Sequence, residues 1–396
     1  MAGTTGMHEA MSGYIVQQVI NGIQIGSMYA LIALGYTLVY GIIKLINFAH
    51  ADIFMVGAYV AFFLVSFSAG ASPFPFQLSI LIGLAIAYLI VSAVFERPFI
   101  QQVLSKTRDT SVSAHKKAAF YVFQNALWLC CLVMVTCVTA PALFFSSRFV
   151  FSLRLGPLFF PVLIAYVMTV CAVIGIAMER IAYRPLRKKR RLSALITALG
   201  VSYFLENFCS LDFAFGSAYR AFPELITKTD IARVPGLDVA ITNIFVINIV
   251  VLAALLALLW FLVEKTLIGK QMRAVACNRD AASLMGIDVN RIISFTFAIG
   301  PALAGVSGIL YAMNYGVLQS PFLGFFPGMK AFIAAVLGGI GSLPGAVIGA
   351  FIMGISEVFA NSIDSNLGFA AAFIILIVIL LVKPTGILGK SEQEKV

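Results

Sequence analysis

The stretch VAITNIFVINIVVLAALLALLWFLV, residues 239–263, contains no Asp, Glu, Lys, Arg or His. A helix needs about 20 apolar residues to cross the hydrocarbon core of a bilayer, so this stretch predicts a transmembrane helix. Similar charge-free runs occupy residues 10–43, 53–95, 118–147, 155–178, 292–329 and 331–356. Hydrophobic residues make up 61% of the chain and charged residues only 11%, against about 25% charged in soluble domains. The sequence therefore predicts an all-α, polytopic transmembrane helical bundle.

Most of the 27 Lys and Arg residues lie in short segments that flank the apolar runs. These basic segments are residues 97–117, 180–191, 265–291 and the C-terminal residues from Lys383 onward. Cytoplasmic loops carry such an excess of Lys and Arg, so we expect these segments and the C-terminus in the cytoplasm. The basic residues behind the net charge of +10 then indicate how the chain is oriented in a bacterial inner membrane, where lipid surrounds it. No nucleic-acid partner is expected.

Threading the chain between these inside segments predicts about ten spans in one membrane domain, residues 1–396. Met1 to Gly13 include no Lys or Arg, unlike a signal peptide, so we expect the first span to be retained and the N-terminus to lie outside. The spans are expected at residues 16–40, 53–69, 77–95, 119–143, 158–178, 193–211, 244–263, 291–313, 329–361 and 366–382.

The span at 329–361 contains the stretch GGIGSLPG, residues 338–345. Gly and Pro at this density free backbone groups that lipid cannot satisfy. A broken helix that faces a cavity or a partner would satisfy them, and such helices mark substrate pathways in many transporters. Gly338, Gly339 and Gly341 are therefore candidate pathway residues.

Residues 264–290 form a polar segment between two expected spans and are too many for a simple turn. Asn278 or Asp280 could begin a short helix there, and Gly286 could end it. One face of that helix would carry Ala281, Leu284 and Met285. An apolar face at the cytoplasmic surface can dock into a groove on a partner or lie on lipid. The spacing leaves both interpretations open.

Signatures of an enzyme or a metal site are weak. Residues 384–391, PTGILGKS, have Pro384 where a phosphate-binding loop requires its first Gly. The three His residues are scattered, and none of the six Cys residues makes a CxxC pair. We expect a chain that is not an enzyme and that binds no cofactor or metal itself.

Several ordered stretches resemble the permeases of branched-chain amino-acid ABC importers. They include GSMYALIALGY at 26–36 and ERIAYRPLR at 179–187, and further matches lie at 21–22, 40–43, 46–50, 273–274, 286–287, 329–332, 335–342 and 384–389. The resemblance implies an inner-membrane subunit that translocates branched-chain or related amino acids by ATP-driven alternating access. It also implies two cytoplasmic ATPase subunits that carry ATP-Mg, a related second permease subunit and a periplasmic substrate-binding protein.

In this family the loop that corresponds to 264–290 docks the ATPase subunit and transmits its motion. The resemblance therefore implies an ATPase-coupling role for Arg273, Ala274, Asp280, Ala282, Gly286 and Ile287. Two departures stand out. An additional block near 97–178 would add two spans without changing the downstream topology, and Ala51 stands where the family commonly has Gly.

Polar residues of the first span and of the turn after it complete the candidate path: Asn21, Tyr29, Asn47 and His50. Ionisable groups at membrane depth are functional candidates, whereas residues of a turn at the cytoplasmic edge would simply face water. Both interpretations of Asn47 and His50 stay open at this point. Two alternative functions also stay open: a urea or short-chain amide ABC permease, and a secondary transporter driven by an ion gradient.

Overall fold

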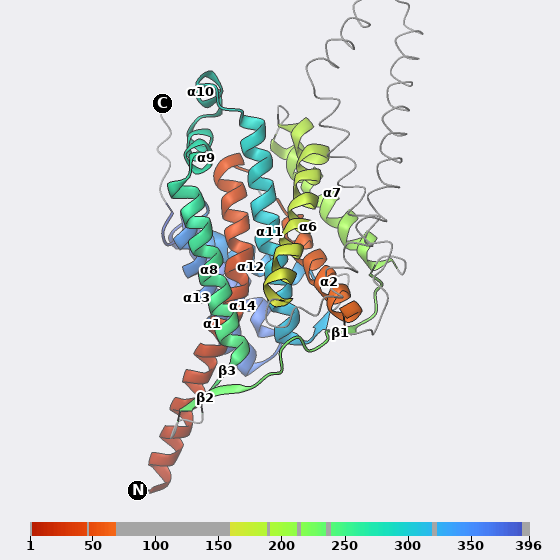
Figure 1. Ribbon diagram of the computed structural model, residues 1–396. Helices are drawn as coiled ribbons and strands as arrows, with labels where there is room; N and C mark the ends of the chain where they lie inside the picture. Colours follow the sequence, from red (N-terminus) through yellow and green to blue (C-terminus); the bar gives the residue numbers. More distant parts are fainter. Residues whose placement is uncertain are drawn as a thin grey trace, which may run out of the picture.

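The computed structural model describes residues 2–45, 47–68, 159–187, 191–211, 215–234, 239–318 and 323–389. Helices dominate these residues (Figure 1). They are α1 (Ala2–Ile43), α2 (His50–Ser68), α6 (Phe159–Met178), α7 (Arg191–Ser210), α8 (Asn243–Lys265), α9 (Leu267–Cys277), α10 (Arg279–Leu284), α11 (Val289–Tyr315), α12 (Phe325–Gly338), α13 (Leu343–Ile363) and α14 (Leu367–Val382). Two antiparallel strand pairs join them: β1 (Arg220–Ala221) with β4 (Val317–Leu318), and β2 (Asp230–Val234) with β3 (Val239–Thr242).

The predicted all-α membrane architecture is confirmed. Among the described residues, six helices are long and apolar enough to cross a membrane, and α2, α12 and α14 are shorter apolar helices. Every predicted span within the described ranges coincides with a helix, except that the span at 329–361 corresponds to two helices, α12 and α13. The spans at 77–95 and 119–143 lie outside the described residues, as does most of the block 97–178. The described end of that block is α6, which packs against α11 and α2.

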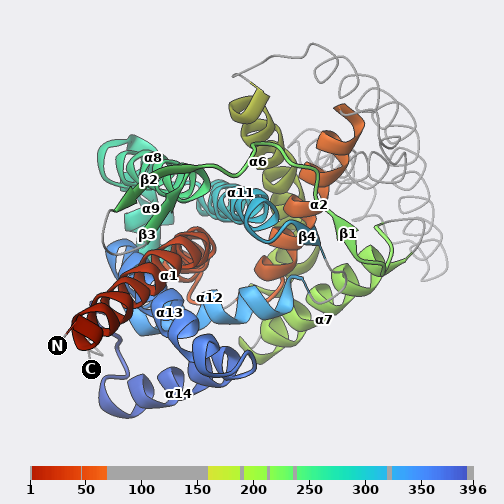
Figure 2. The same cartoon turned by 90° about the horizontal axis from the view of Figure 1, so that it is seen from below.

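Glycines bring the core helices together at their crossing points. The largest helix–helix contact joins α1 and α13, and a Cβ added at Gly22 would lie 2.5 Å from the Cα of Ile355. On the other side of the bundle, Gly57 of α2 meets Gly305 of α11 equally closely. Figure 2 shows α11 between α1 and the pair α2 and α6. Lipid tails are as apolar as Leu, so close packing of this kind drives membrane helices to associate.

The predicted break in the span 329–361 lies between α12 and α13. Gly339 and Gly341 have φ angles of 103° and 99°, in a region that glycine adopts far more readily than other residues. The hydroxyl of Ser342 then accepts a hydrogen bond from the backbone N–H of Gly345 and begins α13. The span is therefore two helices rather than one.

The backbone groups freed at the break find partners inside the protein. The N–H of Ile387 donates to the carbonyl of Leu337, and the N–H of Leu388 donates to the carbonyl of Gly338, each at 2.9 Å. These bonds bring the segment after α14 onto the end of α12. A membrane core requires this kind of internal satisfaction, because lipid offers no hydrogen-bonding partner.

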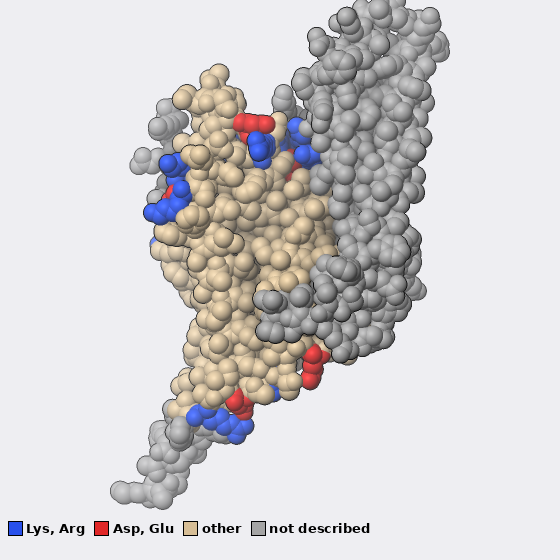
Figure 3. Space-filling view, viewed as in Figure 1, with Lys and Arg blue, Asp and Glu red and all other residues tan. Residues whose placement is uncertain are grey.

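The two ends of the bundle differ in what they carry. The N-terminus, β2 and β3 lie at one end, whereas α9 and α10 lie at the other (Figure 1). On the visible face, charged side chains gather at these ends and leave a broad uncharged band between them (Figure 3). This band has the character of a surface that faces the hydrocarbon of a bilayer.

Candidate functional site

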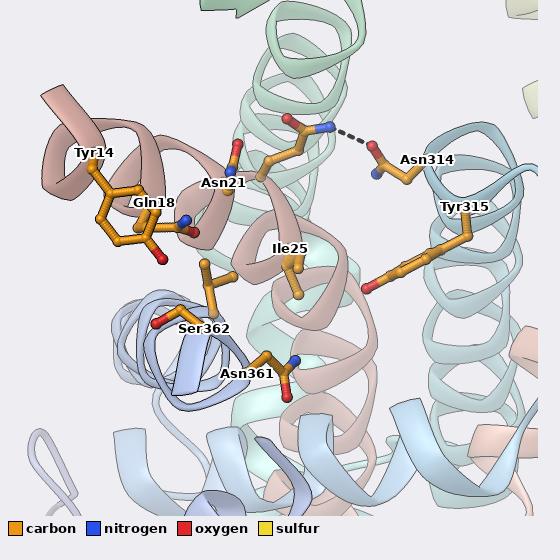
Figure 4. A pocket seen from close by; sticks show the side chains of 10 residues that line it. Tyr14, Gln18, Asn21, Ile25, Asn314, Tyr315, Asn361 and Ser362 are labelled. Carbon is orange, nitrogen blue, oxygen red and sulfur yellow. Dashed lines mark hydrogen bonds between the residues drawn. The ribbon is translucent and has the colours of Figure 1, made fainter. Parts of the chain in front are cut away.

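A cavity of about 420 Å³ opens between α1, α11 and α13 (Figure 4). Two apolar residues and a set of amides and hydroxyls line it: Ile25 and Val358, then Tyr14, Gln18, Asn21, Gln24, Asn314, Tyr315, Asn361 and Ser362. Gln24 of α1 donates a hydrogen bond from Nε2 to Oδ1 of Asn314 of α11, across the cavity wall. Because each amide offers both donors and an acceptor, this lining can replace the hydration of a small polar molecule.

A buried ion pair lies beside this cavity. Nζ of Lys330 in α12 lies 2.5 Å from Oε1 of Glu357 in α13, and Tyr29 of α1 donates from its hydroxyl to the other carboxylate oxygen at 2.8 Å. Glu357 is only 4% exposed. Glu357 directly precedes Val358, and Tyr29 lies one helical turn beyond Ile25, so both are next to lining residues of the cavity. Ionisable groups buried in a membrane bundle are functional candidates by default.

The turn after α1 lies inside the protein. Lys44 ends α1 with a φ of 56°, and the chain then returns along α1 until His50 packs against Gly35 and against the edge of Tyr36. His50 has no exposed surface and Asn47 only 1%. The interpretation in which these residues simply face water is therefore wrong.

A π-helical turn, Glu179–Tyr183, extends α6 to this turn. The Tyr183 hydroxyl donates to Oδ1 of Asn47 at 2.5 Å, while the carboxylate of Glu179 accepts hydrogen bonds from Arg187 and from Ser294 of α11. Single π-helical turns inside α-helices frequently occur at functional sites. Here the turn links α6, α11 and the buried residue Asn47.

The segment 264–290 forms two short helices, α9 and α10. Thr266 caps α9 through its hydroxyl, and Asn278 caps α10 by accepting from the N–H groups of Asp280 and Ala281. Gly286, with a φ of 82°, follows α10 in the left-handed conformation expected of a residue that ends a helix. Asn278 thus begins the short helix predicted from the sequence.

One side of α10 rests on the bundle while the other side is open. Ala282 is buried, whereas Leu284 and Met285 are 87% and 82% exposed. Within α9, Arg273 donates from Nη1 to the carboxylate of Glu264 at 2.8 Å and to the carbonyl of Val263 at 2.6 Å. The segment is therefore anchored at its base and presents an apolar pair outward.

The segment also contacts the end of α1 directly. Nη2 of Arg279, at the start of α10, donates to the carbonyl of Ile42 at 3.2 Å and to the carbonyl of Ile43. The last carbonyls of a helix have no partner within the helix, and a cation placed there is favourable. Arg279 therefore joins α10 to the helix that lines the cavity.

The predicted site residues fall in four places rather than one. Asn21 lines the cavity and Tyr29 contacts the ion pair beside it. Gly338, Gly339 and Gly341 form the break, and Asn47 and His50 form the buried turn. Arg273, Ala274, Asp280, Ala282, Gly286 and Ile287 all belong to the α9–α10 segment or its end.

Sequence reasoning missed the ion pair. The charge-free run 331–356 is bounded by Lys330 and Glu357, so the signal was present at the two ends of the run. It also missed Asn314 and Asn361, whose amides could be placed in a cavity only once α1, α11 and α13 were assembled.

Comparison with known proteins identifies the family. The family model of the permease component of branched-chain amino acid transport systems matches residues 18–107 and 113–382. The chain belongs to this family. This permease is 36% identical over 386 residues to the high-affinity branched-chain amino acid transport system permease protein LivH of Escherichia coli K12, covering 97% of the chain and 98% of LivH. It is 34% identical over 385 residues to BraD of Pseudomonas aeruginosa, a protein described in the same words, with the same coverage.

A more distant similarity reaches sugar permeases. The fructose import permease FrcC of Rhizobium meliloti is 27% identical over 145 residues, which is 35% of the chain and 40% of FrcC. No solved structure matches the chain. As a permease component, the chain is a transport subunit of a membrane system with other components. In the part of the chain that the structure describes, no group of three His, Cys, Asp or Glu side chains could hold a metal ion.

Proposed function

We propose that this permease is the membrane-spanning subunit through which a bacterial ABC importer moves branched-chain amino acids across the inner membrane. The observation that carries the proposal is similarity along nearly the whole chain to LivH and BraD, both named for high-affinity transport of these amino acids. A polar cavity within the helical bundle supports it, because small solutes bind in concave sites with a few placed polar groups.

In this proposal the segment 264–290 is the contact for the ATPase. α9 and α10 project from one end of the bundle (Figure 1), and their exposed pair Leu284 and Met285 suits a groove on a partner. Ala282 holds α10 on the bundle, and Gly286 permits the turn back into α11. Arg273, Ala274, Asp280 and Ile287 complete the coupling segment.

Motion of α10 would reach the path through named contacts. Arg279 holds the last carbonyls of α1, and α1 carries Asn21 and Gln24 in the cavity wall. The turn with Asn47 and His50 follows α1, and the break at Gly338, Gly339 and Gly341 precedes α13. A shift of α1 relative to α13 would then open one end of the path as the other closes, which is alternating access.

The remaining components follow from this role. Two cytoplasmic ATPase subunits would bind ATP-Mg, a related second permease subunit would complete the membrane unit, and a periplasmic binding protein would deliver the substrate. The basic residues of 265–291 support a cytoplasmic position for the α9–α10 end, by the positive-inside rule. In this orientation the N-terminus would lie in the periplasm and the C-terminus in the cytoplasm.

The substrate test compares leucine with urea. The permease is reconstituted in liposomes with its second permease and ATPase subunits, and each candidate binding protein is added outside with labelled leucine or labelled urea. ATP-dependent accumulation of leucine is expected. Accumulation of urea without leucine would contradict the substrate assignment and favour the short-chain amide alternative.

A further inference from the structure

The ion pair lies one helical turn from the cavity along both α1 and α13. Along α13, Asn361 follows Glu357 by four residues, and residues four apart lie on the same helix face. Along α1, Tyr29 follows Ile25 by the same interval. Tyr29, Glu357 and Lys330 are therefore the ionisable and hydroxyl groups that lie one turn beyond the amides of the cavity.

The ion pair lies within the thickness of the membrane. Glu357 is six residues from the end of α13 nearest the cavity, or about 9 Å along the helix axis at a rise of 1.5 Å per residue. The ammonium group of Lys330 lies at the same depth, because its Nζ is 2.5 Å from Oε1 of Glu357. Phe369 of α14 covers the ammonium group, whose Nζ lies 5.9 Å from the ring centroid. Both charges are thus shielded from water and depend on each other.

This dependence makes the pair selective for one kind of ligand. Separating two buried opposite charges leaves each without a counter-ion, which is strongly unfavourable. A ligand that carries both charges removes that difficulty, because its carboxylate can bind Lys330 while its ammonium group binds Glu357. The single ion pair becomes two, and the net charge of the site stays at zero. Urea carries no formal charge and cannot make this exchange.

We propose that Lys330 and Glu357 are a binding site for the zwitterionic backbone of an α-amino acid on its way through the permease. Tyr29 orients the carboxylate of Glu357 by donating to the oxygen that Lys330 does not hold. The amides of the cavity carry the solute to the site without trapping it by charge. This inference rests on the proposed function, and it adds the chemistry by which an amino acid is accepted.

The first test removes the charges in pairs. Glu357→Gln and Lys330→Gln each leave one buried charge unpaired, so a loss of uptake in either could reflect folding. The double variant Lys330→Met/Glu357→Leu avoids this, because an apolar pair often replaces a buried ion pair without loss of stability. We expect the double variant to assemble with the ATPase and to show ATP hydrolysis that the binding protein stimulates. Its rate of leucine uptake should nevertheless fall by a factor of at least about ten.

The matched control is the exposed ion pair of β2. Asp230→Asn/Arg233→Gln also neutralises one acidic and one basic residue, and its uptake should equal that of the unmodified complex. A double variant at 330 and 357 that transports leucine as fast as this control would overturn the inference, because the pair would then be only structural. If the unmodified complex takes up no leucine with ATP, the proposed function itself is wrong, so the two failures are distinguishable.

A second measurement does not depend on the double variant. Asn361→Cys places a thiol in the cavity, next to the turn of α13 that carries Glu357. A small cationic methanethiosulfonate added from the periplasmic side should abolish leucine uptake in this variant and leave the unmodified complex active. Modification of the thiol, verified by mass, without any fall in uptake would show that the solute does not pass this site.

Discussion

Arg279→Gln tests the link between α10 and α1 most sharply. The guanidinium donates two hydrogen bonds to the carbonyls of Ile42 and Ile43 at the end of α1. A hydrogen bond from a charged group contributes about 1.5–3 kcal/mol, and the side chain is only half-buried, so we take about 1–2 kcal/mol for the link as a whole. A free energy of that size corresponds to a factor of about 5–30.

The assay is the number of leucine molecules transported per ATP hydrolysed in the reconstituted complex. We expect this ratio to fall by about fivefold to thirtyfold in Arg279→Gln, while the binding protein still stimulates ATP hydrolysis. Arg279→Lys, which keeps a cation near the same carbonyls, should give an intermediate ratio. The exposed residue Arg291 supplies the control, Arg291→Gln. An unchanged ratio in Arg279→Gln would refute the idea that motion passes from α10 to α1 through this contact.

Three further predictions concern other contacts. Gly354→Ala would bring a Cβ to 2.7 Å from the Cα of Gly26, and such overpacking should lower the free energy of unfolding by about 1–3 kcal/mol. The midpoint temperature of thermal unfolding in detergent should therefore fall. Gly200→Ala, with open space around it, should not lower this midpoint. The side chain added by Gly286→Ala meets no neighbour, but the residue must adopt a φ near 82°, at a cost of roughly 1–2 kcal/mol. The number of leucine molecules transported per ATP hydrolysed should therefore fall, with little change in the unfolding midpoint. A normal ratio would mean that the end of α10 takes no part in coupling. Leu284→Ser/Met285→Ser should weaken co-purification of the ATPase and leave the unfolding midpoint unchanged, because both side chains are exposed in the isolated chain; full retention of the ATPase would place the docking surface elsewhere.

The spans were predictable because their signal is local. A charge-free run, a basic flank or the GGIGSLPG interruption can be recognised from neighbouring residues alone. Within the described ranges the charge-free runs correspond to helices, and the interruption corresponds to the break between α12 and α13. The helix after Asn278 was predictable for the same reason, since capping involves residues two or three apart. Its docking role came only from the resemblance.

The ion pair was not predictable from local patterns. Lys330 and Glu357 are 27 residues apart, and only the break between α12 and α13 folds the two helices against each other. Each residue alone could have been an anchor at a membrane interface, where Lys commonly extends toward water. Their pairing required the tertiary structure.

The buried turn shows how a correct span boundary can still mislead. Placing the first span at 16–40 put Asn47 and His50 just beyond it, at the expected cytoplasmic edge. The structure instead continues α1 to Ile43 and returns the chain along the helix, so that the glycine at position 35 leaves room for the imidazole of His50. Sequence cannot show this return, because it depends on packing between residues on different helices.

The most direct test of the central claim is the energy source of leucine accumulation. Labelled leucine uptake is measured in liposomes that hold the permease with or without its ATPase subunits. Each sample is measured with and without ionophores that abolish all ion gradients, and with ATP or a non-hydrolysable analogue supplied to the ATPase side. An ATP-driven permease should concentrate leucine with ATP and fail to do so with the analogue or without the ATPase subunits. Leucine accumulation that persists without the ATPase and disappears with the ionophores would contradict the account and identify a secondary transporter.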